Sequence, residues 1–184
     1  MALKNSQLSV VSCGIALQAF ILVLLDTFVA KAAGLPAGVG IWVAFQAWAV
    51  YFLAGCNPMG GLKAFIGYAT GILASIIIIE LMGAPGISAL PAVAGMNLVM
   101  ATAVAILVIP AIFLSEKLKN MIPALFIGSG AFFALTAIMG LGTEATYLDI
   151  IRAELVYCAY GLVFGYITVF WRSRYEASLN KDKP

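Results

Sequence analysis

Long apolar runs separated by short polar connections dominate the sequence. Six runs come close to or exceed the ~20 residues that a helix needs to cross a bilayer core. They cover Leu8–Ala30, Val39–Cys56, Leu62–Met82, Ala92–Leu114, Met121–Leu141 and Ile150–Trp171. The connections between them contain glycines and prolines, and most of the charged residues lie outside the runs. The pattern predicts an all-α polytopic membrane domain of six transmembrane helices, residues 1–171, followed by a basic cytoplasmic tail, residues 172–184.

Composition supports this class of protein. Of 184 residues, 64% are apolar, 10% are charged and none is histidine, and the mean hydropathy is +1.08. Soluble domains have roughly 45–50% apolar and about 25% charged residues. The first run is longer than the ~7–15-residue core of a signal peptide, so an uncleaved first helix is expected. A net charge of +2 does not suggest a nucleic-acid partner.

Lysine and arginine are distributed unequally between the two sides that six crossings define. One side carries Lys4, Lys63, Lys117, Lys119, Arg172, Arg174, Lys181 and Lys183, and the other carries Lys31 and Arg152. Cytoplasmic loops hold the excess of positive charge. Both termini are therefore predicted to be cytoplasmic.

The connection "GCNPMGGLK" at residues 55–63 resembles three known motifs in part. A phosphate-binding loop requires Gly-x-x-x-x-Gly-Lys-Ser/Thr, but Gly61 stands where the lysine should be. A water-channel pore needs two Asn-Pro segments, and the chain has one. We therefore interpret the segment as a turn in which Asn57-Pro58 ends one helix and Gly60-Gly61 loosens the start of the next.

Two pairs of glycines have the spacing of close-packing membrane helices. They are Gly67 with Gly71 in the third run and Gly161 with Gly165 in the sixth. The third and sixth helices are therefore candidates for close packing, within one subunit or between subunits. The alternative is chance occurrence in glycine-rich helices.

Polar side chains inside the apolar runs are the candidate functional residues, because such groups usually face the bundle interior or a water-filled path. Gln18 and Gln46 lie near the middle of consecutive runs, so they form either a polar waist in a pore or a hydrogen-bonded pair. Asn97 lies in the outer third of the fourth run. Trp48 and Tyr51 belong to an aromatic cluster on the second run that either lines a passage or packs against lipid and other helices.

Acidic residues gather near the outer face: Asp26, Glu80, Glu144, Asp149 and Glu154. Such an outer mouth would attract cations. Asp26 and Glu80 lie at or just inside the apolar boundary, which makes them the best candidates for a functional carboxylate. Arg152 is expected to pair with Asp149 or Glu154.

Catalytic and metal-binding sets are not found in the sequence. The three cysteines are far apart in the chain, and without histidine a transition-metal site is not expected. Asp26 is the one aspartate embedded in a run, so paired aspartates for intramembrane proteolysis are lacking as well. We expect neither an enzyme nor a cofactor.

The segments "GLPAGVGIWVAFQAWAVYFLAG" (34–55) and "GGLKAFIGYATGILAS" (60–75) resemble a family of small bacterial six-span inner-membrane proteins catalogued as a domain of unknown function. The resemblance implies the inner membrane and brings no substrate. Residues 34–36, Trp42, Lys63, Gly67 and Gly71 also resemble, more loosely, the membrane half of the aromatic-acid exporter and fusaric-acid-resistance families. That second resemblance implies dimers that move organic anions.

The sequence thus predicts a small channel or transporter for a compact polar solute (a small amine, amide or organic acid). A chain this short has little room for its own pore, so a homo-oligomer in the lipid bilayer is expected. The alternative is a non-transporting membrane subunit that docks a partner or lipid through its basic tail.

Overall fold

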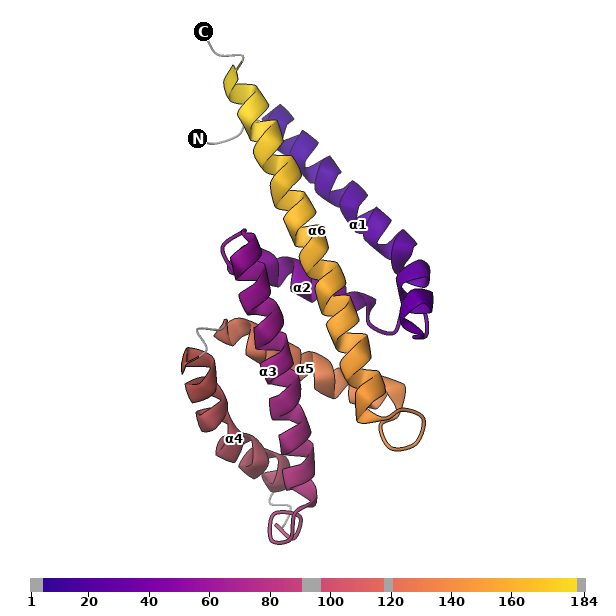
Figure 1. The fold of residues 1–184 in the computed structure, drawn as a ribbon, viewed down its shortest axis with the longest axis vertical. Helices are drawn as coiled ribbons and strands as arrows, with labels where there is room; N and C mark the ends of the chain where they lie inside the picture. The colour runs from indigo at the N-terminus through magenta and orange to yellow at the C-terminus, as the bar shows by residue number, and fades with distance from the viewer. Residues whose placement is uncertain (1–4, 91–96, 118–120, 182–184) are drawn as a thin grey trace.

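The computed structural model describes residues 5–90, 97–117 and 121–181, which form six α-helices (Figure 1). They are α1 (Asn5–Ala33), α2 (Ile41–Leu53), α3 (Pro58–Gly83), α4 (Leu98–Lys117), α5 (Ile122–Met139) and α6 (Tyr147–Lys181). Within this described part, every helix except α2 is long and apolar enough to cross a membrane. The expected all-α membrane class is confirmed.

The second helix is shorter than its apolar run. The run Val39–Cys56 predicts a span, but α2 has 13 residues, a length of about 20 Å against a hydrocarbon core of ~30 Å. Gly55 and Cys56 both have positive φ, 91° and 56°, so the chain leaves the helix before the apolar run is complete. Its crossing of the membrane therefore does not follow from its length.

Other boundaries also differ from the prediction. The fourth helix begins at Leu98 rather than Ala92, and residues 91–96 lie outside the described part. The sixth continues to Lys181, so residues 172–181 of the predicted tail extend α6. Residues 182–184 of that tail, with Lys4 and Lys119, lie outside the described residues.

The segment at residues 55–63 is a turn followed by a capped helix start. The side-chain oxygen of Asn57 accepts a hydrogen bond from the backbone N–H of Gly60 (2.8 Å), and Pro58 occupies the first helical turn. This is the expected chemistry of a helix N-terminus. A side chain at Gly60 would overlap the backbone oxygen of Ala54, so this glycine lets the turn close on α2.

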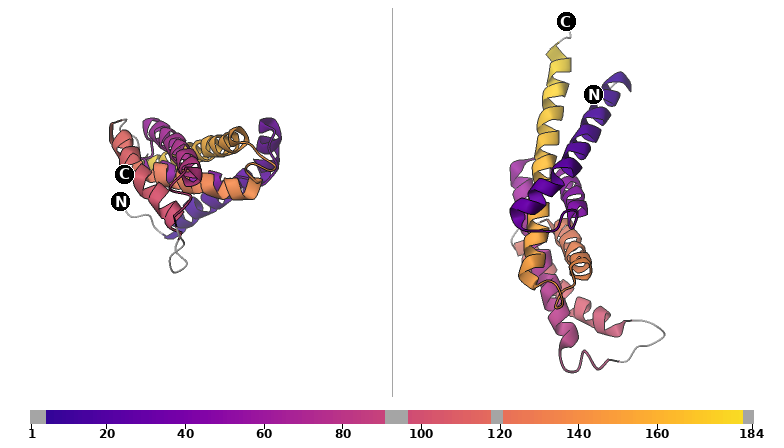
Figure 2. Two further views of the ribbon diagram at one scale, coloured as in Figure 1. Left: turned by 90° about the horizontal axis from the view of Figure 1, so that it is seen from below. Right: turned by 90° about the vertical axis from the view of Figure 1, so that its right-hand side faces the viewer.

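The longest helix, α6, packs against α1, α2, α3 and α5. In Figure 1, α1 lies beside one part of α6, while α3 and α4 form a pair at the other end of the molecule. The short α2 and α5 cross between these pairs, as the turned views in Figure 2 also show. The bundle is therefore elongated and organised around α6.

Helix pairing follows a symmetric scheme. The most extensive contacts are α3 with α5 and α2 with α6, and α1 lies on α6 as α4 lies on α3. Exchanging the first three helices with the last three leaves this scheme unchanged. Repeats related in this way are common in transporters.

Both Gly-x-x-x-Gly motifs lie at close helix contacts, but their partners differ from the expected pairing of the third and sixth helices. Added side chains at Gly67 and Gly71 would collide with α5, at Ala124 and at the backbone of Leu125. Added side chains at Gly161 and Gly165 would collide with Ala44 and Tyr51 of α2. Because both motifs are used inside the chain, these glycines no longer argue for a homo-oligomer.

The outer helices expose apolar side chains to their surroundings. Phe28 of α1 is 70% exposed and Ile109 of α4 is 75% exposed, as expected for positions that face lipid. Tyr68, Phe132 and Leu135 are fully buried between α3, α5 and α6. The outer faces of α1 and α4 therefore suit contact with lipid, and the buried core lies around α3, α5 and α6.

Candidate functional site

The contact between α1 and α6 is held by hydrogen bonds along its length. We call it the α1–α6 seam, and its polar members are Gln18, Asp26, Arg152, Tyr157, Tyr160 and Thr168. From Arg152 to Thr168 the seam covers 16 helical steps, or roughly 24 Å at 1.5 Å per residue. That is most of the ~30 Å thickness of a bilayer core.

At one end of the seam, Thr168 joins three helices. Its hydroxyl lies 2.5 Å from Gln18 Oε1 on α1, and it accepts a 3.0 Å hydrogen bond from the indole N–H of Trp48 on α2. The same hydroxyl lies 2.8 Å from the backbone oxygen of Phe164, so Gln18 Oε1 and this backbone oxygen are both acceptors for the one hydroxyl proton. Gln18 and Trp48, both predicted from sequence, are thus brought together through a threonine.

Toward the other end, Asp26 is buried with two donors. The hydroxyl of Tyr157 donates to Oδ1 and the backbone N–H of Gly38 donates to Oδ2, each at 2.7 Å. The residue is 6% exposed. Between these ends, the Tyr160 hydroxyl donates to the backbone oxygen of Leu22 (2.7 Å). Asp26 therefore fastens the loop after α1 to both helices.

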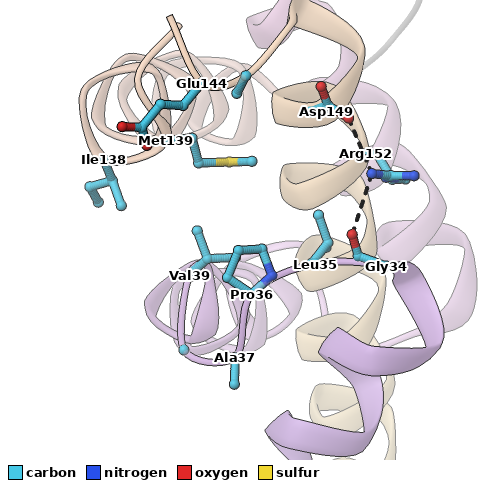
Figure 3. A pocket seen from close by; sticks show the side chains of 12 residues that line it. Gly34, Leu35, Pro36, Ala37, Val39, Ile138, Met139, Glu144, Asp149 and Arg152 are labelled. Atoms are coloured by element: carbon cyan, nitrogen blue, oxygen red, sulfur yellow. Dashed lines mark hydrogen bonds and ion pairs between the residues drawn. The ribbon is translucent and has the colours of Figure 1, made fainter.

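That loop lines a pocket of about 630 Å³ (Figure 3). The opposite walls are the end of α5, the α5–α6 connection and the first turns of α6. Its charged members are Glu144, Asp149 and Arg152, and the last two form a 3.1 Å ion pair. The guanidinium also lies 3.5 Å from the backbone oxygen of Gly34. Two carboxylates and one guanidinium give this pocket a formal charge of −1.

Glu154 lies on α6 between these features but does not line the pocket. It is fully buried, and neither carboxyl oxygen accepts a hydrogen bond from a described protein group. Its electrostatic neighbours are Cys158, one turn along α6, and Tyr68 on α3. The alternative that Arg152 pairs with Glu154 is wrong, since Asp149 is the partner in the ion pair.

Other predicted site residues lie apart from the seam. Gln46 is exposed on α2, so the structure does not bring it to Gln18. Exposed Glu80 accepts a 2.8 Å hydrogen bond from the hydroxyl of Tyr147. Asn97 accepts from the backbone N–H of Met100 (2.9 Å) and caps the start of α4. Tyr51 is buried between Gly61 and Gly165, where its hydroxyl has no partner among the described residues.

Sequence reasoning passed over several members of the seam. Tyr157, Tyr160 and Thr168 gave no signal, because hydroxyl side chains are common in membrane helices and often bond to their own backbone. Glu154, which lies outside the seam, did carry a signal of its burial in the sequence. It shares the spacing i, i+4, i+7 with Cys158 and Gly161, and therefore the buried face of α6.

The described fold defines the class, a multi-pass α-helical membrane protein. The family described as "Protein of unknown function (DUF1097)" matches residues 16–171, and the chain belongs to it. The expected membership of a family of unknown function is confirmed, while no comparison links the chain to the aromatic-acid exporters. No curated protein and no solved structure is significantly similar to it.

Proposed function

We propose that this protein carries a compact polar solute across the bacterial inner membrane along the α1–α6 seam. The supporting observation is that hydrogen-bonding side chains follow one another along this contact for most of the thickness of a bilayer. Polar side chains are costly to place in lipid unless they are hydrogen-bonded or face a water-filled path, and a row of them along one helix contact supports such a path. The pocket at Gly34 and Arg152 is the proposed outer entrance.

The proposal includes six crossings with both termini in the cytoplasm. The end of α1 lies at Arg152 near the start of α6, whereas the α2–α3 turn lies beside Ser173 and Arg174 near its end. The segment from Gly34 to Pro58, which contains α2, therefore runs beside most of the length of α6. Such a path supports a crossing by the short α2, and the positive charges at the second end favour the cytoplasmic side.

α1 is suited to moving during transport. Much of its surface is apolar and exposed, and its inner face meets α6 through polar contacts. Hydrogen bonds that exchange partners leave no buried polar group unsatisfied, and so avoid the desolvation penalty of an unmade bond. We therefore assign α1 the role of the moving wall of the pathway.

Solute flux into liposomes tests the proposal, with Gln18→Leu and Gln46→Leu as a matched pair. Purified protein is reconstituted, and shrinkage and swelling are followed by stopped flow with ammonium, small amides, amines and carboxylates. We expect flux above that of empty liposomes. Gln18→Leu should reduce it because the seam amide is lost, and Gln46→Leu should not because this amide is exposed on α2.

Two results would contradict the proposal. Flux no greater than in empty liposomes for every solute would remove the transport function. Equal flux in wild type and Gln18→Leu, with Gln46→Leu reduced instead, would move the pathway away from the seam.

A second candidate function rests on the cytoplasmic end of α6. This helix has 35 residues, well beyond the ~20 needed to cross, and its last turns carry Arg172 and Arg174. A basic extension of this kind suits anionic lipid headgroups or a partner subunit. Replacing Arg172 and Arg174 by glutamine separates the two functions. Retained flux supports transport by the membrane bundle, and lost flux with intact folding favours docking.

A further inference from the structure

Glu154 lies where three helices meet. The carboxyl belongs to α6, its neighbour Tyr68 belongs to α3, and the Tyr68 backbone is in close contact with Gly128 of α5. Both side chains are fully buried. The Tyr68 hydroxyl, like both carboxyl oxygens, has no hydrogen-bond partner among the described residues. Two polar groups that suit each other are therefore buried close together without forming the bond.

A carboxyl group that is buried in a membrane bundle without a hydrogen-bond partner is costly in free energy. An ionised carboxylate taken out of water needs an opposite charge or several donors. Asp26, the other buried carboxylate of the bundle, has two donors at 2.7 Å. Ionisable residues inside membrane bundles without a structural partner are associated with ion and proton pathways.

The surrounding helices supply no positive charge to Glu154. On α3 the titratable residue near it is Tyr68, because Lys63 and Glu80 are near the two ends of that helix. The sequence of α5 contains no titratable side chain, and that of α2 contains Tyr51 alone. On α1, Asp26 faces Tyr157 on the seam. On α6 itself, Cys158 is the nearest titratable group along that face, and Arg152 is paired with Asp149.

A proton is the ligand that fits. Glu154 lines neither the outer pocket nor the groove beside Tyr51 and Arg174. A solute or hydrated metal ion would need such a cavity, whereas a proton needs only a transient chain of water molecules or hydroxyl groups. Protonation removes the charge of the carboxyl and gives it an O–H to donate, and Tyr68 offers an acceptor or donor in either state.

We propose that Glu154 is a proton-binding site that couples proton movement to the transport described above, with Tyr68 as its hydrogen-bond partner. A proton from water on one side converts the carboxylate to the neutral acid, and its release to water on the other side restores the charge. Because the carboxyl lies where α3, α5 and α6 meet, its change of charge acts on the packing between the two three-helix halves. The coupling role depends on the proposed transport function, but the proton site itself does not.

Infrared difference spectroscopy of the purified protein tests the site without any transport. Wild type, Glu154→Gln and Asp26→Asn are compared between about pH 6 and about pH 8, a range in which exposed carboxyl groups stay ionised. We expect a protonated-carboxyl band in wild type that is lost in Glu154→Gln and retained in Asp26→Asn. A band that persists in Glu154→Gln, or one that disappears only in Asp26→Asn, would overturn the assignment.

Uptake into liposomes under a pH gradient tests the coupling. A difference of about one pH unit supports up to about tenfold accumulation of a neutral solute moved with one proton. We expect accumulation in wild type, and in Glu154→Gln flux that no longer responds to the gradient. Flux in wild type that ignores the gradient would refute the coupling and leave the transport function standing. If no solute crosses, the transport function and the coupling both fail, and the infrared result decides the proton site alone.

Discussion

Two buried carboxyl groups of this protein have opposite surroundings. Asp26 accepts hydrogen bonds from Tyr157 and from the backbone of Gly38, while Glu154 accepts none from a described protein group. The sequence indicated Asp26 as a functional candidate and placed Glu154 among the acidic residues near the outer face, as a candidate ion-pair partner of Arg152. Glu154 is two positions from Arg152, or about 200° around a helix, which turns it to the opposite, buried face.

The bond between Tyr157 and Asp26 gives a prediction at the residue scale. Tyr157→Phe removes one donor from a buried carboxylate and should lower the free energy of unfolding by about 1–3 kcal/mol. Thermal unfolding of the purified protein in detergent measures the change. Tyr166→Phe, which alters a side chain that is 47% exposed, is the matched control and should leave the transition unchanged. Equal transitions in wild type and Tyr157→Phe would show that the bond contributes nothing to stability.

At the scale of helices, glycines determine how closely the main pairs approach. α6 meets α2 through Gly161 and Gly165, and α3 meets α5 through Gly67 and Gly71. In each pair the contacts advance in the same direction along both helices, so the paired helices have the same N-to-C direction although they cross at an angle (Figure 1). The side chains of Ser75 and Ser129 add a 2.7 Å hydrogen bond between α3 and α5. Spacing alone predicted that these glycines pack closely, but not which helix would be opposite.

Adding one methyl group tests this packing. Gly161→Ala would overlap the backbone oxygen of Ala44, which cannot move without shifting α2. We expect destabilisation of about 1–3 kcal/mol, the usual cost of overpacking. Gly130→Ala on α5 is the control, because nothing lies within 4 Å of the added carbon. The α2–α6 contact would be looser than described if both variants unfolded at the same temperature.

At the scale of the whole molecule, the path of α2 decides the topology. This helix is the one whose length leaves the crossing open, since its 13 residues reach about 20 Å. The ends of the segment that contains it contact α6 near Arg152 and near Arg174. If the two ends of α6 lie on opposite sides of the bilayer, α2 also crosses it, and the number of crossings is six.

Labelling of single cysteines with a membrane-impermeant thiol reagent tests the six-span topology. Cys56 is kept in one variant with Cys13 and Cys158 replaced by alanine, and Ala37→Cys or Thr143→Cys is introduced where all three native cysteines are replaced. We expect labelling of Ala37→Cys and Thr143→Cys from the outside only, and of Cys56 from the inside only. Labelling of positions 37 and 56 from the same side would mean that α2 does not cross.

The sequence by itself determined the class of this protein, because chain segments this apolar are stable in lipid only as helices that satisfy their own backbone. It also located the turn at Asn57-Pro58 and the close-packing glycines, whose effects are local. Tertiary structure decided which polar groups meet. The sequence predicts matching depths for Gln18 and Gln46, but Gln18 bonds to Thr168 of α6 whereas Gln46 is exposed on α2. Rotation about a helix axis and the choice of neighbouring helix depend on packing across the whole bundle. Helix rotation and the choice of neighbour thus left Glu154 buried with no donor among the described residues, and brought Asp26 to Tyr157.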